Sequence, residues 1–274
     1  DKGLSQTSGK NSFLTGVIAQ SLRTLVNMIE VDLFTVAKTG ASRAYGTAGT
    51  APFGTAGDLS DTAGVALILD DNGCPITDRH LVLSNAAMNN MRAKQSNLYQ
   101  GGSDLLTRGM VAEFGGFAIH QSGGISPHTK GTGTGYLLNL TAGYDVGSTS
   151  FVIDTGSNTI LAGDILTNTK TSRDTNKYVI PANGTTTAVT INKPGNKVAW
   201  VNNDPLSIGN AYTGNFAFHR NAIWLATRAP AVPEGGDSAT DSTMLVDPVS
   251  GLAFEMREYR QYRQVAWEVA IAWG

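Results

Sequence analysis

Residues 13–38, FLTGVIAQSLRTLVNMIEVDLFTVAK, carry the longest periodic pattern of the chain and determine its architecture. Apolar residues recur there in steps of four or three, which is the period of an α-helix. They are Leu14, Ile18, Leu22, Leu25, Ile29, Leu33 and Val36. Asn11 or Ser12 is suited to cap the start and Gly40 to end the helix. At 1.5 Å per residue such a helix is about 39 Å long, so we expect a spine that lies along a sheet.

The residues after this helix change in character twice. Residues 40–61 are small and polar and predict a long loop. Residues 62–128 then predict an α+β unit. Its expected helices are 63–69, 86–94 and a further one capped by Asp104, and its expected strands are 81–83 and 115–121.

From about residue 129 to 211 the chain reads as short apolar alternation broken by Gly, Asn, Asp and Pro. This pattern predicts a small β-barrel or sandwich without helices. The candidate strands are 135–140, 149–153, 164–167, 178–180, 188–191 and 198–201. The C-terminal residues 252–257 and 265–273 predict two antiparallel strands that pack with the N-terminal helix, so the β-rich middle is expected to be an insertion into an α+β body.

Composition excludes several classes of protein. Charged residues make up 15% of the 274 residues and the formal net charge is −2, which argues against a protein that mainly grips nucleic acid. Hydrophobic residues make up 41%, which argues against disorder. The single cysteine, Cys74, excludes an intrachain disulfide and any site with several cysteine ligands.

The stretch FVIDTGSNTI, 151–160, matches the Asp-Thr-Gly-Ser loop of aspartic peptidases. Such an enzyme needs a second carboxylate to share a proton with Asp154, and no second Asp-Thr-Gly or Asp-Ser-Gly follows. We therefore expect Asp154 to be a turn residue between two strands. The four histidines, His80, His120, His128 and His219, lack the spacing of a helical ligand pair. We predict no catalytic, metal-ligating or cofactor-binding residue, and no enzyme.

The segment YRQYRQ, 259–264, alternates aromatic residues with arginines as some nucleic-acid sites do. Because it lies between two predicted strands, a hairpin connection or a subunit contact is the favoured interpretation.

Several blocks, in this order, resemble the major coat proteins of tailed bacteriophages, in the branch of the short-tailed Salmonella phages whose subunit has an inserted β-barrel domain. They are IAQSLRTLVNMIEVDL and ASRAYGTAGTAPF, then LDDNGCPITDRHLVLSNAA and DLLTRGMVAEFGGFAIHQS, then AGDILTNTKTSRDTNKYVI, GNAYTGNFAFHRNAIWLATRAPAVPEG and MLVDPVSGLAFEMREYRQYRQVAWEVAIAWG. Together they cover nearly all of the chain.

The resemblance implies the Hong Kong 97 capsid fold, which is an α+β fold. Residues 1–11 would end an extended loop, 12–61 would hold the spine helix and the loop after it, and 247–274 would be the strands of the peripheral domain. Residues 62–128 and 212–246 would form the axial domain, and 129–211 the inserted barrel. In the family an N-terminal arm and the first half of the extended loop come before the spine helix, so such residues are expected upstream.

The resemblance further implies a structural subunit that assembles in the host bacterial cytoplasm into the icosahedral head of the virion. Its partners would be many copies of itself, as pentamers and hexamers, with scaffolding and portal proteins, around double-stranded DNA bound without sequence specificity. No cofactor or membrane is implied. The candidate inter-subunit contacts are Arg23, Glu30, Arg43, Arg173, Asp174, Lys177, Arg260 and Arg263. The alternatives are an aspartic peptidase that uses Asp154 and a β-rich phage decoration or adhesin module, which would have little use for the long helix.

Overall fold

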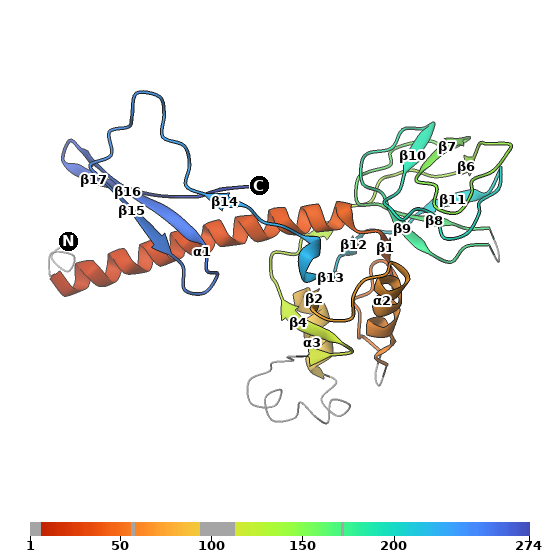
Figure 1. Cartoon of the computed structure of the whole chain (residues 1–274), viewed down its shortest axis with the longest axis horizontal. Helices are drawn as coiled ribbons and strands as arrows, with labels where there is room; N and C mark the ends of the chain where they lie inside the picture. Colours follow the sequence, from red (N-terminus) through yellow and green to blue (C-terminus); the bar gives the residue numbers. More distant parts are fainter. Residues whose placement is uncertain (1–6, 56–57, 94–112, 171–172) are drawn as a thin grey trace. The chain divides into compact units, whose positions relative to one another are not determined.

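The computed structural model of the chain describes residues 7–55, 58–93, 113–170 and 173–274 (Figure 1). It is a mixed α+β protein, as predicted, with helices α1 (Thr7–Gly40), α2 (Ser60–Asp71) and α3 (Asn85–Ala93) and many antiparallel strands. The chain divides into two compact units. One contains Asp1–Asp32 and Ile223–Gly274 and is called the sheet unit below; the other, Leu33–Ala222, is called the core unit.

The middle of the chain forms a seven-stranded antiparallel sheet in the order β1-β9-β8-β11-β6-β7-β10. Its strands are β1 (Arg43–Ala44), β6 (Tyr136–Leu138), β7 (Ser150–Asp154), β8 (Ile165–Asn168), β9 (Lys177–Val179), β10 (Ala188–Thr190) and β11 (Pro205–Ile208). Side chains alternate between buried and exposed along β7, as the sequence pattern requires. The inward residues make one apolar core that includes Tyr136, Phe151 and Trp200. We call residues 129–211 with β1 the seven-stranded module.

One predicted strand of this module is wrong. Residues 198–201 form no strand, and Trp200 makes only an isolated bridge with Tyr144. The strand lies instead at β11, where Leu206 and Ile208 both point inward. Pro205 is its first residue, a position at which a missing N–H is tolerated.

The remainder of the core unit is built on a four-stranded sheet in the order β13-β2-β4-β3. Its strands are β2 (Arg79–Leu83), β3 (Glu113–Phe114), β4 (Phe117–Gln121) and β13 (Phe216–His219), and a short 3-10 turn, Arg220–Ala222, follows β13. β2 and β4 run parallel, and α3 lies between them in the sequence. The core on one face includes Leu81, Leu83, Met91, Phe117 and Ile119. The predicted helices 63–69 and 86–94 are confirmed as α2 and α3, whereas the one capped by Asp104 lies outside the described residues.

Two short strands, β5 (Pro127–His128) and β12 (Tyr212–Thr213), pair where the chain enters and leaves the module.

The sheet unit holds the start of α1 and a three-stranded antiparallel sheet of β15 (Asp241–Val246), β16 (Ala253–Gln261) and β17 (Gln264–Ala270). Two short strands, β14 (Thr227–Arg228) and β18 (Ala272–Trp273), pair with each other; β14 comes before these three strands in the sequence and β18 after them. Within this unit the Trp273 indole Nε1 donates a hydrogen bond to Asp32 Oδ2 at 3.0 Å. The predicted hairpin at 259–264 is confirmed, and Arg263 adopts a φ of +59° in its turn.

Two expectations differ from this structure. Residues 7–11, expected to end an extended loop, are the first residues of α1, so neither Asn11 nor Ser12 caps it. Residues 223–246, expected in the axial domain, group with the C-terminal strands, because β15 pairs with β16 and β14 with β18. None of the described helices is long and apolar enough to cross a membrane.

Candidate functional site

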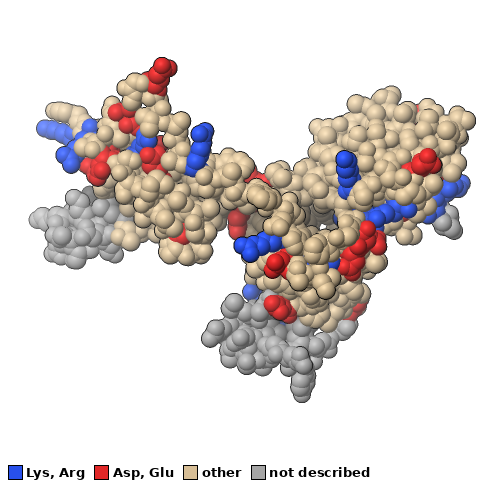
Figure 2. Space-filling model, viewed as in Figure 1, with Lys and Arg blue, Asp and Glu red and all other residues tan. Residues whose placement is uncertain are grey.

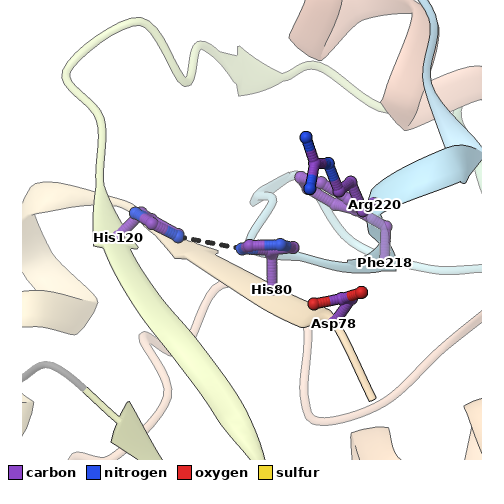
Figure 3. Close-up of a pocket in the computed structure, with 5 residues that line it drawn as sticks. All are labelled: Asp78, His80, His120, Phe218 and Arg220. Atoms are coloured by element: carbon purple, nitrogen blue, oxygen red, sulfur yellow. Dashed lines mark hydrogen bonds between the residues drawn. The ribbon is translucent and has the colours of Figure 1, made fainter. Parts of the chain in front are cut away.

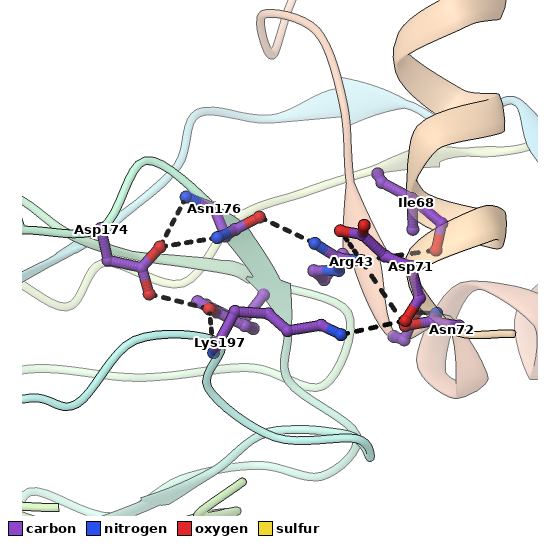
Figure 4. A network of polar contacts seen from close by, with 9 residues as sticks. Arg43, Ile68, Asp71, Asn72, Asp174, Asn176 and Lys197 are labelled. Atoms are coloured by element: carbon purple, nitrogen blue, oxygen red, sulfur yellow. Dashed lines mark hydrogen bonds and ion pairs between the residues drawn. The ribbon is translucent and has the colours of Figure 1, made fainter. Parts of the chain in front are cut away.

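The most extensive polar network lies where the seven-stranded module meets the ends of α1 and α2 (Figure 4). β1 begins three residues after α1 and pairs with β9, with Arg43 opposite Tyr178. The buried Arg43 guanidinium donates from Nη1 to Asn176 Oδ1 at 2.9 Å and from Nη2 to Asp71 Oδ2 at 3.0 Å. It therefore joins the module directly to the end of α2.

Three further side chains of the module bind backbone carbonyls outside it. Asn192 Nδ2 donates to the carbonyls of Thr39 at 2.6 Å and Ala41 at 2.8 Å, at the end of α1 where helix carbonyls lack intrahelical partners. Lys197 Nζ donates to Asp71 O at 3.1 Å, and Lys177 Nζ donates to Gly46 O. The module is therefore fixed to the body by side chains that its own sequence pattern does not mark as special.

Asp174 extends this network into the module's interior. Its Oδ1 accepts hydrogen bonds from Asn176 N at 2.9 Å and Nδ2 at 2.8 Å. Its Oδ2 accepts from Tyr178 Oη at 2.8 Å and Trp200 Nε1 at 3.0 Å. Burial, and to a smaller degree the Asp174 carboxylate, raise the pKa of the Tyr178 phenol far above its ordinary value. Through Asp174 and Asn176, the indole of the module core is connected to Arg43. Figure 4 shows the part of this chain of bonds from Asp174 through Asn176 to Arg43.

A second buried polar cluster stands where the chain enters and leaves the module. His128 Nε2 lies 2.8 Å from Asp164 Oδ1, and both side chains are buried. The backbone N–H groups of Gly131 and Leu161 also donate to Asp164, at 3.0 and 2.7 Å. Tyr212 packs on the His128 ring and donates to Gly163 O at 2.6 Å. Burial, followed by the Asp164 charge, raises the pKa of Tyr212 to about 12.

The structure places four of the eight predicted contact residues in bonds within the core unit. Arg43, Asp174 and Lys177 belong to the network above, and Arg173 Nε lies 2.8 Å from Asp204 Oδ2. Asp174 in particular is buried, so it offers no surface. The sequence analysis missed Asp71, Asn176, Asn192 and Lys197, because single polar side chains at helix ends and in loops leave no periodic signal.

The other four predicted contact residues belong to the sheet unit. Arg23, Arg260 and Arg263 are exposed and Glu30 is half-buried. Arg260 Nε donates to Glu258 Oε1 at 3.1 Å, and the Arg263 guanidinium lies 5.7 Å from the centre of the Tyr262 ring. Contacts of these residues with a second subunit stay a prediction.

The three-stranded sheet has one strongly polar face. Arg257 lies opposite both Ser242 on β15 and Glu268 on β17, so these three share a face. Arg257 donates to Glu255 Oε1 at 2.9 Å and to Asp237 Oδ2. Tyr259 Oη donates to Glu268 Oε2 at 2.9 Å. These bonds keep the charged side chains of this face occupied within the sheet unit.

Many large apolar side chains of the sheet unit are exposed to solvent. Among its described residues only Leu22, Ile29, Phe254 and Ile271 are buried apolar residues. Twelve large apolar or aromatic side chains are exposed. They are Val17, Met28, Val31, Trp224, Leu225, Val232, Met244, Val246, Val249, Tyr262, Val265 and Trp267. An exposed apolar surface on this scale is typical of a protein that associates.

An open pocket of about 360 Å³ on the core unit is lined by Asp78, His80, His120, Phe218 and Arg220 (Figure 3). His80 Nδ1 and His120 Nε2 lie 3.0 Å apart. No sequence pattern pairs these two histidines, because they are 40 positions apart on different strands.

Asp154 ends β7, as predicted for a turn residue. Its Oδ1 accepts a hydrogen bond from the neighbouring Thr155 hydroxyl at 2.7 Å, and Thr155 has a φ of +60°. Gly156 N donates to the Asp154 carbonyl at 2.6 Å, which closes a tight turn. In the described parts of the chain no second carboxylate bonds to it.

No protein-family model matches the chain, and no curated protein matches it. The described residues contain no group of three or more His, Cys, Asp or Glu side chains arranged to hold a metal ion.

Proposed function

We propose that the chain is the major capsid protein of a tailed double-stranded DNA phage, a structural subunit that assembles with copies of itself into an icosahedral head. The finer fold that goes with this proposal is the Hong Kong 97 type with an inserted β domain. In this proposal the subunit works as part of the virion, with scaffolding and portal proteins as its partners and no catalytic step.

The observation that carries the proposal is the imbalance of the sheet unit. Among the residues of this unit whose burial is described, four buried apolar side chains make a very small core, and twelve large ones face solvent. At about 25 cal/mol per Å² of apolar surface removed from water, contact between copies would supply the burial that the unit lacks. A subunit of a closed shell gains this burial from several neighbours at once.

The distribution of charge fits the same proposal. Figure 2 shows that the visible face of the seven-stranded module is largely uncharged, with a few separate Lys and Arg side chains along its lower edge. A protein that held DNA tightly would gather basic residues, because each phosphate contact adds to affinity. A shell that must admit and release a genome benefits from weak contacts with it.

The order of elements also supports the proposal. The larger part of the long N-terminal helix, up to Asp32, and a C-terminal antiparallel sheet share one unit, while the β-rich middle lies in the other. This layout agrees with the blocks of sequence that resemble the coat proteins. A decoration or adhesin module has no evident use for a helix of 34 residues.

The test is electron microscopy of the full-length purified protein, combined with sedimentation velocity. We expect closed shells or rings of subunits under assembly conditions. A protein that stays monomeric with scaffolding protein present would contradict the proposal. Met244→Glu on β15 and Val265→Glu on β17 should shift the protein toward monomers, since each places a charge on an exposed apolar position of the sheet unit. Val146→Glu, at an exposed apolar position of the seven-stranded module, is the matched control. It should impair assembly less than Met244→Glu and Val265→Glu do.

A further inference from the structure

The open face of the four-stranded sheet holds two histidines that point toward each other (Figure 3). In the parallel pair β2–β4, His80 lies opposite Ala118 and Val82 opposite His120, so the imidazoles are diagonal neighbours on one face. The alternate residues of the same strands, such as Leu81 and Ile119, are packed in the core on the other face. That packing fixes the two backbone positions from which the rings project.

The charged groups around the pair balance each other. Asp78 comes just before β2 and Arg220 just after β13, and the Arg220 N–H donates to the Asp78 carbonyl at 3.1 Å. Phe218, opposite His80 on β13, stacks on its ring with 6.1 Å between centres. One carboxylate and one guanidinium therefore line the pocket with the two imidazoles, and neither sign dominates.

The facing nitrogens of the two rings are the atoms that could bind a metal ion. When both imidazoles are neutral, one of the two facing nitrogens carries the hydrogen and the other offers a lone pair. Burial, followed by the proximity of His80, lowers the pKa of His120. Protonation of both rings would place two cations side by side near Arg220, which disfavours the doubly charged pair, and metal ions bind the neutral form.

The spacing of the nitrogens suits a metal ion. Nitrogens 3.0 Å apart, each at about 2.0–2.1 Å from a shared ion, subtend an angle of about 94° at that ion. This is close to the 90° between adjacent ligands of an octahedral or square-planar ion. A tetrahedral ion would need the nitrogens to separate by roughly 0.3–0.4 Å, which small rotations of the two side chains provide.

From this geometry we propose that His80 and His120 form a binding site for a late first-row divalent metal ion, with Cu²⁺ and Ni²⁺ favoured over Zn²⁺. The ion takes the place of the hydrogen between the two nitrogens, and that hydrogen is carried by the other nitrogen of the same ring, so both ligands are neutral imidazoles. Water completes the coordination, because no third side chain among the described residues joins the pair as a ligand. With only two protein ligands, the affinity should be weaker than that of a four-ligand structural zinc site.

The test is titration of the untagged full-length protein with Cu²⁺ at pH 7.5, followed by electron paramagnetic resonance. We expect one site per chain whose spectrum shows two coordinated imidazole nitrogens. His80→Asn and His120→Gln should each weaken binding at least tenfold. His219→Gln is the matched control, because His219 lies opposite Arg79 on β13 and outside the pocket, and it should bind as the unaltered protein does.

Two results would overturn this proposal. One is unaltered Cu²⁺ affinity in both single variants with circular dichroism unchanged. The other is a spectrum of the unaltered protein with one imidazole nitrogen or none, which needs no variant to fold. Binding should also weaken as the pH falls, because protons compete with the metal ion for the same nitrogens. The capsid proposal is independent of either result.

Discussion

Replacing Asp174 by alanine should loosen the seven-stranded module while leaving its strand order intact. The carboxylate accepts four hydrogen bonds, and two of the donors, Tyr178 Oη and Trp200 Nε1, belong to side chains that are almost fully buried. The indole N–H can only donate, so the Asp174→Ala variant leaves it without a partner. The phenol still accepts a bond from Lys197 N at 2.8 Å but loses its acceptor.

Each buried polar group left unpaired costs about 1–3 kcal/mol. Relief from burying a carboxylate returns part of this, so we expect a net loss of about 3 kcal/mol in the free energy of opening the module. A loss of that size corresponds to roughly 140-fold faster hydrogen exchange for amides that exchange by this opening. The measurement is hydrogen exchange with mass spectrometry on peptides that cover β9 and β11.

Two further variants make the experiment decisive. Asp174→Asn keeps one carbonyl oxygen but turns an amide N–H₂ toward the donors, so its loss should lie between zero and that of Asp174→Ala. Asp145→Ala removes an exposed carboxylate from the same module and should change exchange by less than threefold. If Asp174→Ala exchanges no faster than Asp145→Ala, the buried carboxylate does not hold the module together and our interpretation of the network is wrong.

Three other predictions follow from the same structure. Arg43→Met should lower the free energy of unfolding by about 2 kcal/mol and speed hydrogen exchange of residues 39–46, because Asn176 and the Asp71 carboxylate lose their shared donor. Arg260→Met, at an exposed position, is the control, and equal effects of the two variants would contradict this role of Arg43. Asp154→Asn should leave both stability and any proteolytic activity unchanged, so a pepstatin-sensitive cleavage that this variant abolishes would revive the peptidase alternative. The free energy of unfolding should fall as the pH rises from about 10 to about 12, because the pKa of Tyr212 is about 12 in the folded state and the phenol of the unfolded chain ionises first. In urea unfolding measured against pH, this fall should be smaller for Tyr212→Phe than for the unaltered chain.

The sequence was most informative where periodicity reports burial. The apolar stripe of α1 and the alternation along β7 both predicted their elements, because a residue's side is set by the period of the backbone. Residues 7–11 were misjudged because they carry no apolar stripe, and β15 was missed because most of its side chains are exposed on both faces of the sheet. A strand without a buried face has no alternation to detect.

Most residues of the polar sites could not be predicted from the sequence, for a different reason. The histidine pair depends on the register of β2 against β4, and the Arg43 network depends on the pairing of β1 with β9. Both registers join residues from distant parts of the chain, and no local pattern encodes them. Asp174 was selected from the sequence by its charge as a contact with a second subunit. In the structure it is buried and accepts hydrogen bonds inside the module instead.

The pairing of β1 with β9 means that the module is not a cassette that can be cut out at residues 129 and 211. One strand of its sheet comes from the segment directly after α1. Deleting the rest would take Asn176 away from Arg43 and Asn192 away from the carbonyls of Thr39 and Ala41. A graft of the module onto another protein would need residues 41–46 supplied alongside it. The unit that could be exchanged between chains is therefore discontinuous in sequence.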